Sequence, residues 1–101
     1  MDADEIRTLL GDNIFERAKK YRKRIQQSTC TVNADGVRHI SAMVQGSGGS
    51  YYYTQAWLRE NGSFVSASCS CPYNQNGEGT YCKHIGALLL DDAEKNAPAP
   101  A

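Results

Sequence analysis

The sequence predicts a small α+β domain: N-terminal helices, an antiparallel β-meander of about four strands, and a final β-loop-α unit. Three patterns predict it. Apolar residues recur at helical spacing over residues 1–25, alternate with period two over 26–70, and return to helical spacing after 82. With 101 residues, 41% of them hydrophobic, the chain suits one globular domain over residues 1–95. Alanine and proline make residues 96–101 a linker or tail.

Two short helices are expected before the first strand. The first spans residues 3–10 and ends at Gly11. The second runs over residues 14–24, and Asn13 followed by Glu16 resembles a capping box at its start. The final helix begins after Cys82 and carries its apolar residues on to about residue 94.

The predicted meander has four strands, over residues 28–33, 38–45, 51–59 and 64–70. Asn61-Gly62 is a strong signal for a two-residue hairpin, which would set Leu58 opposite Val65 on an apolar face. The connection over residues 46–50 is expected to be flexible.

The first hairpin admits two registers. A two-residue loop would set Val32 against His39, whereas a three-residue loop with Gly36 in the left-handed region sets Cys30 against Ile40. The second register matches the apolar faces better. It predicts that Cys30 is a small buried side chain and that His39 faces solvent on the opposite face, where it is not a metal ligand.

One sheet face is predicted to collect aromatic side chains, namely Tyr51, Tyr53, Trp57 and Phe64. These side chains could form a stacking platform for bases. They could also pack under the N-terminal helices, because a sheet face needs a covering layer. Packing is the favoured interpretation.

The densest chemistry lies in the β-loop-α unit, residues 69–94. Cys69 and Cys71 point to one side at the end of a strand, because residues i and i+2 share a face there. Loop-forming residues over 72–80 return the chain to Cys82, expected just before the helix, and to His84 in its first turn. Three thiolates and one imidazole are a ligand set for one tetrahedral Zn²⁺.

Other interpretations of these cysteines are weaker. A disulfide between Cys69 and Cys71 would be strained, and one between Cys71 and Cys82 would leave His84 unexplained. Four protein ligands close the coordination sphere, which is typical of a structural zinc and not of a catalytic one. Three thiolates, a neutral imidazole and Zn²⁺ carry a net charge of −1, and Lys83 is placed to offset it.

The order Cys-x-Cys, ten residues, Cys-x-His resembles the SWIM zinc finger. The stretches VSASCSCP (65–72) and CKHIGALLL (82–90) look like typical members. The stretch IFERAKKY (14–21) is similar to what precedes the finger in bacterial SWI2/SNF2-family helicases. SWIM fingers are also found in plant mutator-type transposases and in some ubiquitin ligases. No ATPase motif such as a P-loop is present, so the chain resembles either an N-terminal piece of such a helicase or a stand-alone copy.

Charge is balanced overall, with 11 basic and 11 acidic residues, but one cluster is basic. Its side chains are candidates for contact with phosphates, together with Lys83 beside the metal ligands. An ordinary solvated helix face would look the same. The basic cluster consists of Arg17, Lys19, Lys20, Arg22, Lys23 and Arg24.

The expected function is recognition. The resemblance implies a module that contacts DNA or the partners of a helicase. The alternative is a protein–protein adaptor that binds no nucleic acid, and a hydrolase with an open zinc site is a distant third. No catalytic motif is visible, so the domain itself is not expected to be an enzyme, although a parent protein could be a helicase or ATPase.

The remaining expectations concern surroundings and partners. The N-terminus lacks a basic segment before an apolar stretch, so no signal peptide is expected, and no apolar run is long enough for a membrane span. A cytoplasmic location, with association to a bacterial nucleoid, fits cysteines that bind metal. We expect a monomer that takes no small-molecule substrate.

Overall fold

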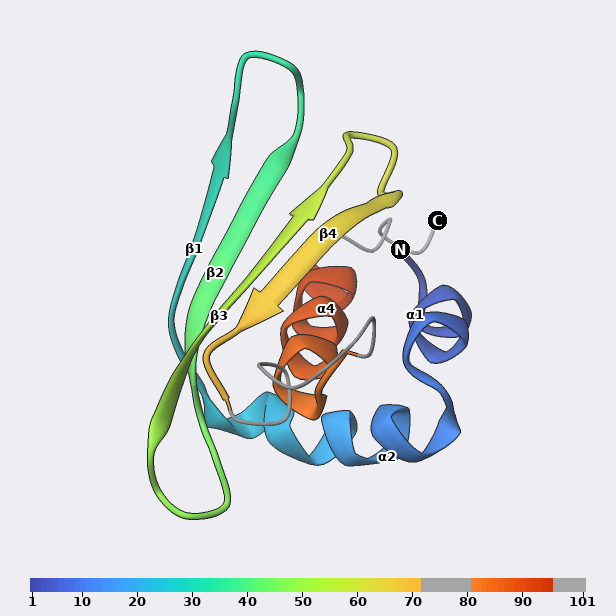
Figure 1. Ribbon diagram of the computed structural model, residues 1–101. Coiled ribbons are helices and arrows are strands. Elements are labelled where there is room, and N and C mark those ends of the chain that lie inside the picture. The colour runs from blue at the N-terminus through green and yellow to red at the C-terminus, as the bar shows by residue number, and fades with distance from the viewer. Residues whose placement is uncertain (72–80, 96–101) are drawn as a thin grey trace.

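A four-stranded antiparallel sheet, backed by helices on one face, confirms the predicted α+β class (Figure 1). The computed structural model describes residues 1–71 and 81–95, so the predicted loop over 72–80 and the tail over 96–101 lie outside the described residues. The strands follow the sheet order β1-β2-β3-β4. In chain order the elements are α1 (Ala3–Leu10), α2 (Asp12–Tyr21), the 3₁₀ helix η1 (Arg22–Arg24), β1 (Ile25–Val32), β2 (Arg38–Gln45), β3 (Tyr51–Leu58), β4 (Phe64–Cys69) and α4 (Lys83–Lys95).

The capping box lies on the first helix, not on the second as predicted. Asp2 accepts a hydrogen bond from the backbone N–H of Glu5 (2.8 Å), and the Glu5 carboxylate accepts one from the backbone N–H of Asp2 (3.1 Å). Helix α2 begins at Asp12, so Asn13 lies inside its first turn and does not cap it. Gly11 ends α1 and directly precedes α2, which leaves no separate linker where a polar side chain could cap the second helix.

The second helix is shorter than predicted and the first strand is longer. α2 ends at Tyr21, residues 22–24 form η1, and β1 starts at Ile25. The first residues of β1 do not show the alternation of apolar and polar residues that predicts a strand. The reason is that the pairing with β2 is irregular between Gln26 and Thr29, where Gln27 has a φ of 54°. An extra residue at such a bulge shifts the period-two pattern.

All three hairpins close in the same way. Each turn has three residues, and the third is a glycine with positive φ: Gly36, Gly49 or Gly62. The flanking backbones pair across each turn, as in the donation from Gly46 to Ser50 (2.8 Å). The predicted pairing of Cys30 with Ile40 is confirmed, and the connection expected to be flexible is a hydrogen-bonded turn.

The predicted register between β3 and β4 is wrong next to the turn. The turn has three residues instead of two, and the N–H of Arg59 donates to the carbonyl of Ser63 (2.9 Å). Leu58 therefore pairs with Phe64, and a bulge follows before the pairing of Ala56 with Ala67. Phe64 consequently packs against the core and not on the outer face, while Val65 is 42% exposed.

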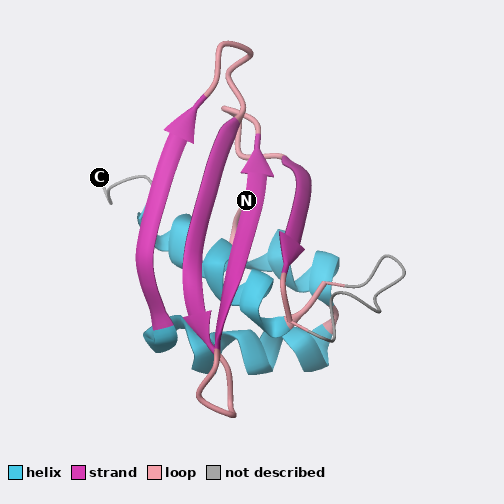
Figure 2. Cartoon of the chain, turned by 60° about the vertical axis from the view of Figure 1, so that its left-hand side comes forward, coloured by secondary structure: helices cyan, strands magenta, loops and turns pink. Residues whose placement is uncertain are grey.

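The outer face of the sheet is bare in the described structure, contrary to the predicted packing of aromatic residues under the N-terminal helices. Figure 2 shows the described helices together behind the sheet. Tyr51 and Tyr53 are 44% and 45% exposed, and Trp57 stacks on His39 with ring centroids 4.8 Å apart. His39 lies on this outer face, as predicted, where it bonds Gln55 (2.9 Å).

The reason for this arrangement is α4. Its residues 84–90 are all buried, so the helix needs cover on every side. The sheet covers one side, and α1 and α2 cover the other (Figure 1). No helix among the described residues remains for the outer face. Arg38 of β2 fixes the far end of α4 through two hydrogen bonds to the carboxylate of Asp92 (2.9 and 3.0 Å).

Cys30 is exposed, so the prediction that it is buried is wrong. Its register with Ile40 does turn it toward the helical side. However, β1 is an edge strand and α4 packs chiefly on β2, β3 and β4, so Cys30 is left exposed beside the helix.

Gly86 marks the closest approach between α4 and the N-terminal helices. A Cβ atom added there would lie 2.6 Å from the Cβ of Ala18 and 2.7 Å from Leu10 Cδ1. We expect Gly86→Ala to destabilise the fold by about 1–3 kcal/mol through overpacking, although alanine favours helix by about 1 kcal/mol. Denaturant unfolding measures this change. Adding Ala18→Gly should recover part of the loss, and a stabilised Gly86→Ala variant would contradict the close contact.

The turn between β2 and β3 offers a test of the energetic cost of the left-handed conformation, because no neighbouring atom would clash with an added side chain. Gly49 has a φ of 89°, Gly48 does not have positive φ, and neither has an atom within 4 Å of an added Cβ. Gly49→Ala should therefore cost about 1–2 kcal/mol of folding free energy, because the left-handed conformation disfavours a Cβ. Gly48→Ala is the matched control and should be neutral or slightly stabilising. Equal losses in thermal or denaturant unfolding would contradict the assigned conformation.

Candidate metal centre

Two neighbouring elements deliver the four predicted ligands to one place. Cys69 is the last residue of β4 and Cys71 follows it, while Cys82 directly precedes α4 and His84 lies in its first turn. The N–H of Gly86 donates to the carbonyl of Cys82 (3.1 Å), which starts the helix at this point. The expected positions of Cys82 and His84 relative to the helix are confirmed.

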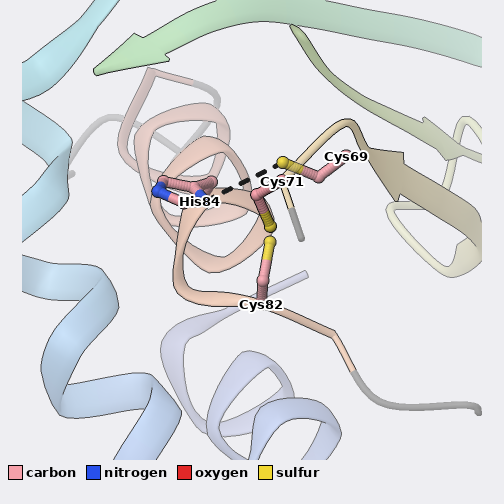
Figure 3. A group of neighbouring side chains, drawn as sticks. All are labelled: Cys69, Cys71, Cys82 and His84. Carbon is pink, nitrogen blue, oxygen red and sulfur yellow. Dashed lines mark hydrogen bonds between the residues drawn. The ribbon is translucent and has the colours of Figure 1, made fainter. Parts of the chain in front are cut away.

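The four side chains converge (Figure 3). Their ligand atoms all lie within 4.8 Å of one another, and the side chains are between 1% and 5% exposed. In a tetrahedral site with Zn–S bonds of about 2.3 Å, sulfur atoms lie about 3.8 Å apart, so the cluster already has nearly the required size. The donor set and the geometry fit one structural zinc ion.

The electrostatics of the cluster favour a cation. The pKa of Cys69 is lowered, chiefly because the thiol of Cys82 donates a hydrogen bond to its sulfur, with His84 and Thr54 adding to the effect. The pKa of Cys82 is raised, because its proton is held in that bond and burial opposes a second thiolate beside the first. The cluster therefore holds one negative charge easily and needs a metal ion to hold more.

The surrounding residues include contacts that the sequence analysis missed. The hydroxyl of Thr54 lies 3.4 Å from Cys69 Sγ, because the two residues pair directly across β3 and β4. The rings of Tyr21 and Tyr52 contact the imidazole of His84, with centroids 5.3 and 5.0 Å away. Thr54 could have been found from the strand register, whereas no sequence signal points to the two tyrosines.

Comparison with known families agrees with this geometry. Residues 52–92 match the SWIM zinc finger. The matched SWIM segment covers β3, β4 and most of α4, including all four ligands, and less than half of the chain. It excludes the basic cluster. No curated protein and no solved structure shows significant similarity to the chain. None of the described helices combines the length and apolar character needed to cross a membrane.

The structure divides the basic cluster into paired and unpaired side chains. Lys19 forms an ion pair with Glu16 (2.6 Å), Arg22 pairs with Glu94, and Arg24 donates to the carbonyl of Gly46 (3.0 Å). In the described part of the chain, three further members make no ion pair and are exposed: Arg17, Lys20 and Lys23. Lys83 extends over the ring of Tyr21, 5.0 Å from its centroid, on the same side as the metal ligands.

Removing the metal should unfold more than the zinc unit. Structural zinc contributes on the order of 10 kcal/mol in small modules, comparable to the whole stability of a domain. Because α4 also packs on α1 and α2, we expect chelation to unfold the helices as well as the sheet. NMR would show this as a loss of chemical-shift dispersion for residues in both parts. An apo protein with native dispersion throughout would show that apolar packing suffices.

The chain offers a matched cysteine control for zinc content. Cys71→Ser should lose the ion, because a hydroxyl does not replace a thiolate ligand. Cys30→Ser should keep one zinc per chain, because Cys30 is exposed and outside the cluster. Elemental analysis of the purified variants measures both. Equal zinc content in the two variants would contradict the ligand assignment.

Zinc affinity should fall as the pH falls. Zinc binds thiolates, and the raised pKa of Cys82 means that this group keeps its proton until the metal displaces it. Metal binding at neutral pH therefore releases protons, and added protons favour the metal-free form. A zinc titration with a competing chelator at several pH values measures the change. Affinity that is independent of pH from about 6 to about 8 would contradict thiolate ligation.

Proposed function

We propose that the protein is a zinc-stabilised recognition module that binds DNA through the basic cluster on α2 and η1. The observation that carries the proposal is the set of exposed cations without ion pairs in the described structure, Arg17, Lys20 and Lys23, on elements that pack next to the zinc unit. Rigid positioning of such cations suits contact with a phosphate backbone. The zinc ion holds the scaffold and takes no part in catalysis.

The resemblance of the sequence to bacterial SWI2/SNF2-family proteins supports a role within or alongside such a helicase. A cytoplasmic, nucleoid-associated monomer is consistent with that role. Recognition of base edges is not part of the proposal, because the exposed ends of α2 offer lysine and arginine and the first turns of α4 are buried. Affinity should be modest, since the chain has no net charge.

DNA binding is tested on the zinc-loaded chain. Lys20→Gln combined with Lys23→Gln should weaken binding to all DNA sequences alike. The slope of log K against log salt should flatten by roughly one unit for each phosphate that the variant no longer binds. Arg59→Gln is the matched control, because Arg59 is exposed in the β3–β4 hairpin, at the end of the sheet away from α2 (Figure 1). Fluorescence anisotropy with single- and double-stranded DNA measures both.

A protein–protein adaptor is the second candidate, and the bare outer face of the sheet favours it. Tyr51 and Tyr53 are each more than 40% exposed on this side of the molecule. If neither form of DNA binds at protein concentrations near about 100 μM and low salt, where non-specific binding usually registers, the adaptor function replaces DNA binding.

A further inference from the structure

A cavity of about 150 Å³ opens directly beside the metal centre. Its walls come from α2, the turn between β2 and β3, the start of β3, the first residues of α4, and the metal ligands Cys71 and Cys82. We propose that this cavity binds a phosphate-type oxyanion, held by Arg17, Lys83 and the imidazole N–H of His84. The cavity shares Arg17 with the basic cluster, but the proposal concerns one oxyanion bound beside His84 and is tested separately from binding of DNA by Lys20 and Lys23.

The first observation is an unused donor. His84 is 4% exposed, and its Nδ1 lies 3.8 Å from Cys69 Sγ, on the side of the metal ligands. With Nδ1 turned to the metal, Nε2 carries the ring proton. Nε2 is buried and has no hydrogen-bond partner among the described residues. A buried N–H group normally has an acceptor, and the described residues supply none to this one.

The second observation is the space left for that acceptor. Gly46 lies opposite His84, and a Cβ atom added to Gly46 would come within 3.6 Å of Nε2. The rings of Tyr21 and Tyr52 flank the imidazole and contact it through their carbons. An added Cβ would also lie 2.6 Å from Tyr52 Cε2, so only glycine keeps the space between Tyr52 and His84 free of a side chain.

The third observation is the charge of the lining. Arg17 and Lys83 both line the cavity, the metal ligands Cys71 and Cys82 form part of its wall, and no aspartate or glutamate of the described residues does. Arg17 has no ion-pair partner in the described part of the chain, and Lys83 extends over the face of Tyr21. Two cations exceed the charge of −1 on a zinc bound by three thiolates and one neutral imidazole, so an anion is still favoured in the cavity.

Size and geometry select the class of anion. The cavity volume of about 150 Å³ is enough for one phosphate group. A tetrahedral oxyanion can accept from a guanidinium, an ammonium and an imidazole N–H that approach from different directions. The hydroxyl of Ser47 on the β2–β3 turn supplies a further polar group on the wall. Free phosphate and a backbone phosphate of a nucleic acid share this chemistry.

The test is an NMR titration of the zinc-loaded, full-length chain with inorganic phosphate, compared with chloride at equal ionic strength. Imidazole ¹H–¹⁵N spectra report which nitrogen of His84 carries the proton. We expect a saturable shift of the Nε2–H signal with a dissociation constant on the order of 1 mM. A second titration with an oligodeoxynucleotide lacking terminal phosphates separates the sources: a shift there assigns the site to backbone phosphates, and a shift with phosphate alone assigns it to the free ion.

Matched variants show whether the cavity is responsible. Arg17→Gln should weaken phosphate binding about tenfold, since it removes a charge-assisted hydrogen bond. Lys20→Gln removes a charge from the same helix outside the cavity and should change the affinity less than about twofold. If Arg17→Gln fails to keep its zinc, Lys83→Gln provides the same comparison. No saturable shift, equal effects of the Arg17 and Lys20 variants, or a zinc ion on Nε2 would each overturn the proposal.

Discussion

The rest of the molecule depends on the tie between the end of β4 and the start of α4. The four ligands join an edge strand to a helix that lies between the sheet and the two N-terminal helices, so one ion fixes three layers at once. The core is otherwise small: apart from the ligands it consists of side chains such as Ile6, Phe15 and Leu89. A chain of this size gains from such a staple, because apolar burial alone barely exceeds the entropy lost on folding. The same arrangement places one ring nitrogen of His84 on the side of the metal ligands and the other toward the adjoining cavity.

Residues close in sequence were the most predictable. The ligand set followed from Cys-x-Cys on a strand and Cys-x-His at a helix start, where local geometry alone determines which side chains meet. Gly36 was assigned correctly to a left-handed turn position, because the alternative register mixed the apolar and polar faces. The regular spacing of Gly36, Gly49 and Gly62 would have shown that all three hairpins share one turn type. That comparison would have corrected the pairing of Leu58, which depended on an Asn-Gly signal considered alone.

Features set by tertiary packing could not be predicted from local pattern. From the sequence, the aromatic residues of the outer face were predicted to be buried, because aromatic residues in strands usually pack on a covered face. Which face is covered depends on where α1 and α2 pack, and the continuous burial of α4 decides that. The exposure of Cys30 has the same origin, since β1 lies at the edge of the sheet and α4 packs chiefly on the other strands. The cavity beside His84 likewise joins three elements that no short window of sequence connects.

The succession of three short hairpins bears on the order of folding. Each strand pairs with its neighbour in the chain, so most sheet pairings join residues close in sequence and the relative contact order of the meander is low. Hairpins of this kind form within microseconds, faster than elements that must first close a long loop. Cys69 and Cys71 can therefore come together through local pairing, whereas Cys82 and His84 arrive only when α4 docks. Because isolated hairpins are marginally stable, we expect closure of the four-ligand set to be the step that consolidates the sheet.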